Sequence, residues 1–192
     1  DGRDPLAKAC KEANTAQHLS DVMAGTESGN RMNLETFVQR NYMEKILCDA
    51  NRRFRDMSNG QFELKLINVE DAGEGKNKGL DLEVYSIVTG KTRSVNTLSG
   101  GESFMAALSL ALGMADQIQA ATAAIHLDVM FIDEGFGSLS DNARNEAVNI
   151  LKEMAGKQRQ IGIISHVSEL KDEIENQLIV KKDDRGSHIS WR

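Results

Sequence analysis

Two adjacent carboxylates, Asp133 and Glu134, directly follow the apolar stretch 127–132. That stretch is rich in strand formers and predicts a strand buried on both faces, as in a parallel sheet. Ligands of open α/β sheets bind beyond the carboxyl ends of strands, where these acids would lie. One carboxylate can hold a metal ion while the other faces an attacking water. The pair favours phosphoryl transfer with Mg²⁺, and a strand that merely ends in acidic residues is the alternative.

A histidine follows the next apolar stretch, because Gln160 to Ile164 runs into Ser165 and His166. The intervening residues 140–155 have the spacing of an amphipathic helix. Two parallel strands joined by that helix would bring His166 to the same sheet edge as the acids. There His166 is a candidate contact to a phosphate, and a purely structural role is the alternative.

A third candidate site is Ser99-Gly100-Gly101-Glu102, which precedes an apolar segment from Ser103 to Ala120. Ser99 and Glu102 have the spacing of a capping box, and the segment predicts a helix that is apolar almost all round and therefore buried. Two glycines in the box leave backbone N–H groups bare at the positive end of that helix. This arrangement suits an anion, although a capping box alone is ordinary.

The remaining pattern supplies elements that could position these residues. Helical spacing predicts one thin, polar helix over 6–23 and a stronger one that begins after Asn33. Period-two alternation predicts three antiparallel strands between 62 and 95, and a hairpin over 177–191. The stronger helix gathers basic residues that either form a solvated face or contact DNA phosphates: Arg40, Lys45, Arg52, Arg53 and Arg55.

Composition limits the possible classes of protein. The chain of 192 residues has 40% hydrophobic residues and a net charge of −6, so no global attraction to nucleic acid or anionic membrane is evident. The longest apolar run, 104–115, is shorter than the ~20 residues of a membrane span. Cys10 and Cys48 lack a metal-binding or disulfide-like spacing, which indicates free thiols in a reducing compartment.

The motifs taken together resemble those of ABC-type ATPases. In chain order they are similar to the signature motif at 98–102, the Walker B motif ending in Asp133-Glu134, the D-loop at Ser138-Leu139-Ser140 and the switch histidine at 164–166. More narrowly, the stretches 50–62, 99–104 and 131–139 resemble the C-terminal ATPase lobe of the SbcC family of bacterial DNA-repair exonuclease subunits. The likeness runs from roughly Asn33 to the end of the chain.

This resemblance implies roles for single residues. Asp133 would bind Mg²⁺, Glu134 would polarise the attacking water, and His166 would contact the γ-phosphate of ATP. Ser99, Gly100, Gly101 and Glu102 would form the site for ATP held by the opposite protomer. The D-loop departs from the family pattern, which usually has Asp where this chain has Ser140.

The resemblance also implies an organisation. Residues 1–30 would be the base of a coiled coil, and 31–192 the C-terminal lobe of an α/β ATPase head with a mixed sheet, parallel core strands and flanking helices. The implied partners are the N-terminal lobe of the same protein, a second head, an SbcD-like metallophosphoesterase nuclease and double-stranded DNA, in the bacterial cytoplasm at the nucleoid. The alternatives are an SMC-like or RecN-like head without a nuclease partner, and a non-hydrolysing dimerisation module.

The sequence itself lacks a complete phosphate-binding P-loop. Gly90-Lys91-Thr92 resembles the end of one, but that motif also needs an earlier glycine, where the chain has Tyr85, and a following helix. We therefore expect that this chain alone neither binds ATP tightly nor hydrolyses it, because no lysine-bearing loop cradles the phosphates. Isothermal titration calorimetry with ATP tests this, and micromolar binding would contradict it.

Overall fold

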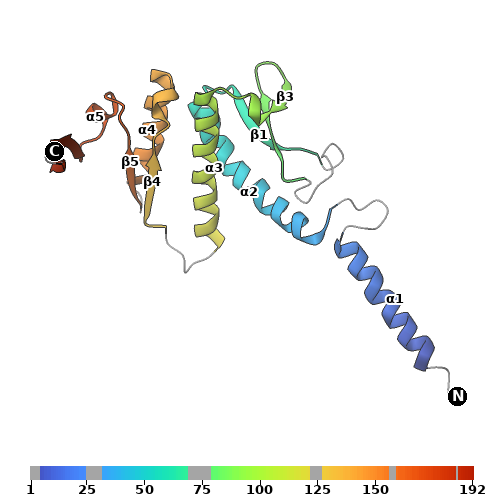
Figure 1. Cartoon of the computed structure of the whole chain (residues 1–192). Coiled ribbons are helices and arrows are strands. Elements are labelled where there is room, and N and C mark those ends of the chain that lie inside the picture. Colours follow the sequence, from blue (N-terminus) through green and yellow to red (C-terminus); the bar gives the residue numbers. More distant parts are fainter. Residues whose placement is uncertain (1–4, 25–31, 69–78, 122–126, 156–158, 185) are drawn as a thin grey trace.

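The computed structural model describes residues 5–24, 32–68, 79–121, 127–155, 159–184 and 186–192, with side chains from residue 12 onward (Figure 1). Helix α1 spans Pro5–Ala24 and projects away from the rest of the chain. Its apolar residues Leu19 and Met23 are exposed, as suits a helix that leans on a separate partner. The sequence also predicts a break after this helix at Gly25, Ser28, Gly29 and Asn30, which lie outside the described residues.

Helix α2 (Leu34–Met57) begins where the sequence predicts. The Asn33 side chain accepts a hydrogen bond from Thr36 N at 2.7 Å, which caps the first turn. The helix ends at Ser58, after which Asn59 and Gly60 take positive φ angles of 52° and 73°. The chain therefore reverses there, as the Ser-Asn-Gly sequence predicts.

The predicted antiparallel meander is confirmed as strands β1 (Phe62–Leu66), β2 (Leu82–Ser86) and β3 (Lys91–Ser94). Leu64 and Val84 face each other across β1 and β2, and both are buried. Asn51 of α2 fixes this sheet by donating to Leu64 O at 2.8 Å and accepting from Leu64 N at 2.7 Å. Gly90 lies in the turn between β2 and β3, so Gly90-Lys91-Thr92 is part of a hairpin and not a P-loop.

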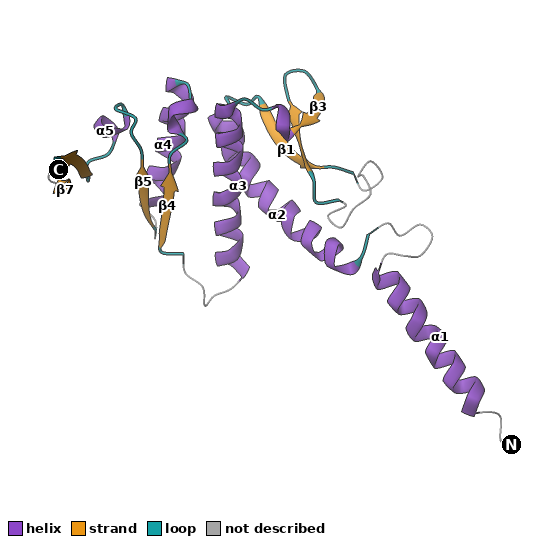
Figure 2. Ribbon diagram, viewed as in Figure 1, coloured by secondary structure: helices purple, strands orange, loops and turns teal. Residues whose placement is uncertain are grey.

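Helix α3 (Gly100–Ala121) is central to the core and packs along α2 (Figure 2). By length and composition this helix would suffice to cross a membrane, but its buried side chains belong to the hydrophobic core. The prediction that α3 is buried all round is wrong, because Met114 and Ile118 are 45% and 38% exposed. Only one face of the helix meets other elements in the part of the chain that the structure describes.

The remaining elements form a parallel pair, a covering helix and a hairpin. Strands β4 (Val129–Asp133) and β5 (Gln160–Ile164) are parallel and are joined through helix α4 (Asp141–Ala155). A short helix α5 (Leu170–Glu173) leads to the predicted hairpin of β6 (Leu178–Asp183) and β7 (Gly186–Trp191). The predicted α/β class is confirmed, and the described strands are distributed over one parallel and two antiparallel sheets.

Strands β4 and β5 are not buried on both faces, which corrects the prediction from their apolar sequence. Met130 and Ile132 pack against the core, whereas Val129 and Phe131 are 51% and 72% exposed on the other face. Strand residues alternate between faces, and α4 contacts β5. Within the described residues the second face has no equivalent cover, so its apolar side chains remain exposed.

The contact between α2 and α3 depends on Gly113. A Cβ atom at this position would lie 2.8 Å from Ile46 O and 3.1 Å from Ala50 N, both in the backbone of α2. The absence of a side chain thus lets the two helices approach closely. Backbone atoms cannot move aside as a flexible side chain can.

We expect Gly113→Ala to destabilise the chain by about 1–3 kcal/mol through overpacking. The sign of the change in unfolding free energy distinguishes the two cases, because alanine in a helix without this contact would stabilise the helix by about 1 kcal/mol relative to glycine. Urea unfolding of both proteins measures the difference. An increase in unfolding free energy would show that α2 does not restrict this position.

Candidate functional site

The parallel pairing of β4 and β5 brings the predicted acidic edge together. Asp133 is in register with Ile164, and Glu134 N donates to Ile164 O at 2.9 Å. Both strands therefore end at one sheet edge, followed by Glu134 on one side and His166 on the other. The placement of His166 beside the acids, expected from the sequence, is confirmed.

Glu134 and His166 contact each other directly. The Nδ1 atom of His166 lies 2.9 Å and 3.1 Å from the two carboxylate oxygens of Glu134. A carboxylate accepts hydrogen bonds, so Nδ1 is the donor in this contact and Nε2 takes no part in it. Glu134 also has a positive φ of 60°, a backbone conformation that non-glycine residues rarely adopt and that is concentrated at functional sites. Both side chains are largely exposed, and the carboxylate can still accept from a water.

Asp133 lies on the exposed face of β4, separate from the Glu134–His166 pair. The described residues contain no cluster of three or more His, Cys, Asp or Glu that could hold a metal ion. Magnesium usually keeps several waters and takes only one or two protein carboxylates, with phosphate oxygens as further ligands. A single exposed Asp133 therefore fits Mg²⁺ brought with a nucleotide better than a permanent all-protein metal site.

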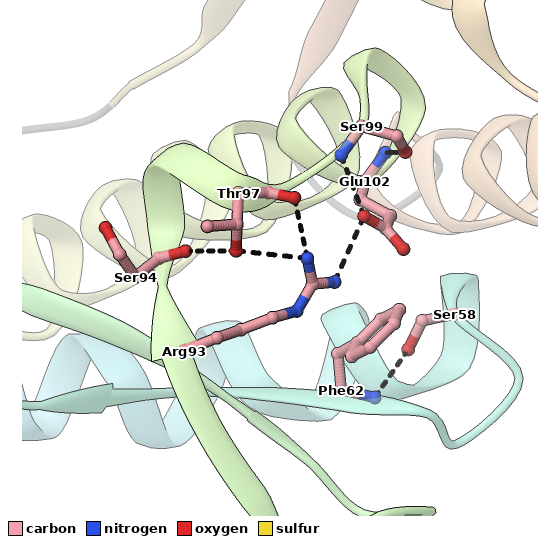
Figure 3. A network of polar contacts seen from close by, with 7 residues as sticks. All are labelled: Ser58, Phe62, Arg93, Ser94, Thr97, Ser99 and Glu102. Carbon is pink, nitrogen blue, oxygen red and sulfur yellow. Dashed lines mark hydrogen bonds and ion pairs between the residues drawn. The ribbon is translucent and has the colours of Figure 1, made fainter.

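The predicted capping box at the start of α3 is confirmed (Figure 3). Ser99 N donates to the Glu102 carboxylate at 2.8 Å, and Glu102 N donates to the Ser99 hydroxyl at 3.3 Å. Helix α3 begins directly after Ser99, at Gly100 and Gly101, so its first backbone N–H groups lie beside this box. The positive end of a long helix is thereby held in a defined orientation.

Arg93 of β3, which no sequence motif marks, holds the start of α3 in place. Its guanidinium lies 3.2 Å from the Glu102 carboxylate and donates to Thr97 O at 2.6 Å, while it stacks over the Phe62 ring (Figure 3). The arginine thus ties the meander to the start of α3. Nothing in the local pattern of β3 indicates this pairing, since it joins a strand residue to a helix across an intervening turn.

These contacts change the acidity of Glu102. Partial burial has the largest single effect and raises the pKa of its carboxyl, but the hydrogen bond from Ser99 N, those from Arg93 and the Ser99 side chain, and the charge of Arg93 outweigh it. The net result is a pKa below the ordinary value of 4.5. The ionised carboxylate is therefore the form that the folded structure favours.

The glycine pair of the box is explained in part by the chain itself. A Cβ atom at Gly101 would lie 2.6 Å from Ser138 O, whereas at Gly100 the nearest atom, Ser138 Cβ, would be 3.7 Å away. The close approach at Gly101 is therefore made by the predicted D-loop, and no phosphate is needed to account for it. Gly100 keeps an open backbone.

The predicted D-loop connects the acidic edge to the start of α3. After Gly135, whose φ is 97° and whose Cβ would clash with the Phe104 ring, a short 3-10 turn covers Phe136–Ser138. Leu139 is buried, and Ser140 caps α4 by accepting from Ala143 N at 3.4 Å. Serine is a favoured capping residue, so this chain uses Ser140 to begin α4.

The basic residues of α2 do not form one free surface. Arg40 donates to Ile67 O at 2.9 Å and to Gly79 O at 2.6 Å, and Arg53 pairs with Asp116 at 2.5 Å. Both side chains are mostly buried, at 16% and 12% exposure. The other three reach solvent: Lys45 above the Tyr42 ring, Arg52 beside Asp49 and Arg55 beside Glu63.

Comparison with known proteins identifies relatives of this arrangement. Residues 78–153 match the family described as SbcC/RAD50-like, Walker B motif. The chain is 45% identical over 172 residues to the SbcC component of the nuclease SbcCD from Vibrio cholerae, an alignment that covers 89% of this chain and 17% of that protein. It is 40% identical over 184 residues to the corresponding protein of Treponema pallidum, with 96% and 17% covered. The chain thus spans less than a fifth of the length of these relatives.

Solved structures of SMC proteins share the fold. An SMC ATPase structure, from work on ATP-driven dimerization and DNA-stimulated activation, matches with a TM-score of 0.62 at 19% identity, covering 82% of this chain and 89% of that one. The Smc head domain of Pyrococcus furiosus with an extended coiled coil, bound to the C-terminal domain of ScpA, gives 0.61 at 16% identity, covering 96% and 41%. At these identities the likeness concerns the fold alone.

Glu102 should contribute to stability in a pH-dependent way. Because its folded-state pKa is lowered, the contribution is fully present above the ordinary value of 4.5 and is lost as pH falls through the lowered pKa. We expect Glu102→Gln to reduce the unfolding free energy by about 1 kcal/mol near pH 7, as for loss of a helix cap. Urea unfolding from about pH 7 to about pH 3 should show the two proteins converging.

The exposed Glu175→Gln controls for loss of a surface carboxylate, and it should not reproduce the effect. A destabilisation by Glu102→Gln that stays constant throughout this pH range would contradict the assignment.

Proposed function

We propose, from the likeness of this chain to SbcC components and from the fold that it shares with SMC heads, that it is the C-terminal half of an ATP-hydrolysing head. The observation that carries the proposal is the sheet edge at which Glu134 and His166 contact each other just beyond Asp133, the last residue of β4, joined through one turn to the capped start of α3. This edge offers a metal ligand, a base and a polar contact. The helix start offers bare backbone donors.

Each side chain has a role that its position suits. Asp133 would bind the Mg²⁺ that accompanies ATP, and the ion would neutralise phosphate charge. Glu134 would accept a hydrogen bond from the attacking water. His166 holds the Glu134 carboxylate through Nδ1 and presents Nε2 to a γ-phosphate. The hydrogen bond between Glu134 and His166 would hold the proposed base beside the proposed phosphate-binding side chain before a nucleotide binds.

The start of α3 would act on a second ATP. Ser99 and the backbone of Gly100 and Gly101 would bind the γ-phosphate of a nucleotide held by another copy of the head, while Glu102 fixes the helix start. The turn Ser138–Ser140 contacts Gly101 and follows the acidic edge, so it would lie between the two nucleotides. ATP would thereby join two heads into a dimer.

The exposed apolar faces support the N-terminal lobe of the same protein as a partner. Phe131 and Ile164 are 72% and 55% exposed on the outer face of β4 and β5. Parallel strands are normally covered on both faces, and contiguous exposed apolar patches indicate a binding surface. A lobe that covers these strands would also bring the missing phosphate-binding loop to the acidic edge.

We propose the coiled-coil base over residues 1–30 and the head lobe over 31–192. The thin apolar side of α1 suits an antiparallel helix partner. The head itself would regulate an SbcD-like nuclease that acts on double-stranded DNA. Among the basic residues of α2, the exposed Lys45, Arg52 and Arg55 are the ones available for DNA phosphates. We place the complete protein in the bacterial cytoplasm, at the nucleoid.

The fold likeness to SMC heads favours a second candidate, a chromosome-organising head without a nuclease partner. Affinity purification of the full-length protein from its host separates the two. A metallophosphoesterase that co-purifies in equal amount supports the first function, and its absence supports the second.

The decisive test of hydrolysis uses the head reconstituted with its N-terminal lobe. We expect Glu134→Gln to keep ATP and Mg²⁺ binding but to slow hydrolysis by ~10²–10⁴-fold, because the water loses its acceptor. The mutant should accumulate as an ATP-bound dimer, which size-exclusion chromatography with light scattering detects.

Asp133→Asn is the matched control, since it removes the neighbouring carboxylate and should instead weaken Mg²⁺-dependent nucleotide binding. Normal turnover by Glu134→Gln would refute the assignment of the base. Absence of ATP hydrolysis in the reconstituted wild type would support the non-hydrolysing dimerisation module.

A further inference from the structure

A second polar site lies at the opposite end of α3 from the acidic edge. A pocket of about 740 Å³ is lined by α2, α3, the end of α4 and Arg159, the residue before β5. Asp116 in this pocket follows Ser99 by 17 residues, about 25 Å along a helix. The pocket also lies where β5 begins, whereas His166 follows the end of that strand.

Two buried arginines share one aspartate in this pocket. Arg53 lies 2.5 Å from Oδ2 of Asp116, and Arg159 lies 3.0 Å from Oδ1, so both carboxylate oxygens are occupied. Arg159 also contacts the Gln119 side chain. The side chains of Arg53 and Arg159 are only 12% and 6% exposed. Two positive charges thus face one negative charge in a largely desolvated cluster.

Each arginine retains an unused donor. The Nη1 atoms of Arg53 and Arg159 are buried, and neither finds an acceptor in the part of the chain that the structure describes. A buried donor attached to a charged group is costly when it has no partner. The two N–H groups without an acceptor define the chemistry of the missing partner: it carries at least two acceptor oxygen atoms, and an anion makes the stronger hydrogen bonds to guanidinium groups.

We propose that this pocket binds a small oxyanion of the phosphate class, held between Arg53 and Arg159. A tetrahedral oxyanion offers several acceptors at once and matches the planar donors of guanidinium groups. Ile150 and Met154 provide the apolar part of the pocket lining. The exposed Arg52, Asp56 and Glu153 also line the pocket, so its three arginines face three carboxylates. The two exposed carboxylates would repel a polyanion such as DNA more than a compact anion that reaches only Arg53 and Arg159.

Titration of the full 192-residue chain with inorganic phosphate, followed by NMR of the arginine Nε–Hε groups, tests the site. We expect phosphate to shift the signals of Arg53 and Arg159. Arg159→Lys keeps a charge beside Asp116 but loses the planar fork, and should weaken phosphate affinity about tenfold or more. Glu153→Gln removes a repelling charge and should strengthen affinity about two- to fivefold. This gain cannot result from misfolding.

Arg55→Gln is the matched control, because Arg55 belongs to the same helix but lies outside the pocket, beside Glu63. It should leave phosphate affinity unchanged. The proposal is overturned if ~10 mM phosphate, about tenfold above a dissociation constant of ~1 mM, shifts neither signal. It is equally overturned if Glu153→Gln and Arg159→Lys leave affinity unchanged, or if duplex DNA shifts the same signals more strongly than phosphate does.

Discussion

The close contact between the first turn of α3 and the turn after β4 is the constraint on which the candidate site depends. Ser138 O occupies the space that a side chain on Gly101 would need, and the Phe104 ring occupies the space beside Gly135. Neither contact leaves room for a methyl group. The capped start of α3 and the acidic edge are therefore packed against the same turn, Phe136–Ser138, and a displacement of this turn would move both.

The start of α3 is also held by an ion pair between Arg93 and Glu102. Arg93 binds Glu102 and Thr97 together, and Glu102 closes the capping box. The meander thus contributes to the site without supplying a residue that faces the acidic edge. This explains why a small antiparallel sheet accompanies a parallel pair: it holds the helix start in position.

The Glu134–His166 pair and the cluster of Arg53, Asp116 and Arg159 differ in the exposure of their charged groups to solvent. Glu134 and His166 form an exposed pair in which neither group carries a large desolvation cost, so both remain available to water and phosphate. Arg53 and Arg159 are buried beside Asp116, and each keeps a buried N–H group that has no acceptor among the described residues. A buried donor without an acceptor is unfavourable, which makes this cluster informative although no sequence motif marks it.

Local sequence determined the helices, the hairpins, the cap at Asn33 and the box at Ser99 and Glu102, because these features depend on residues within one or two turns of each other. It also indicated that Glu134 and His166 meet, since parallel strands joined by a helix leave few topologies. Apolar strand sequence could not reveal the exposed face of β4 and β5. Hydrophobicity does not say which face of a strand a neighbouring element covers, and among the described residues α4 covers only one face of this pair.

Only the tertiary structure decided which charged side chains are buried and bind acceptors inside the fold. By sequence, Arg40 and Arg53 belong to a basic helix face, yet both guanidinium groups turn inward to acceptors far along the chain. The glycine pair suggested that a phosphate approaches closely, but the close approach to the Cβ position of Gly101 is made by Ser138 O. Contacts between residues tens of positions apart leave no periodic trace in the sequence, because their partners are fixed by packing rather than by local backbone geometry.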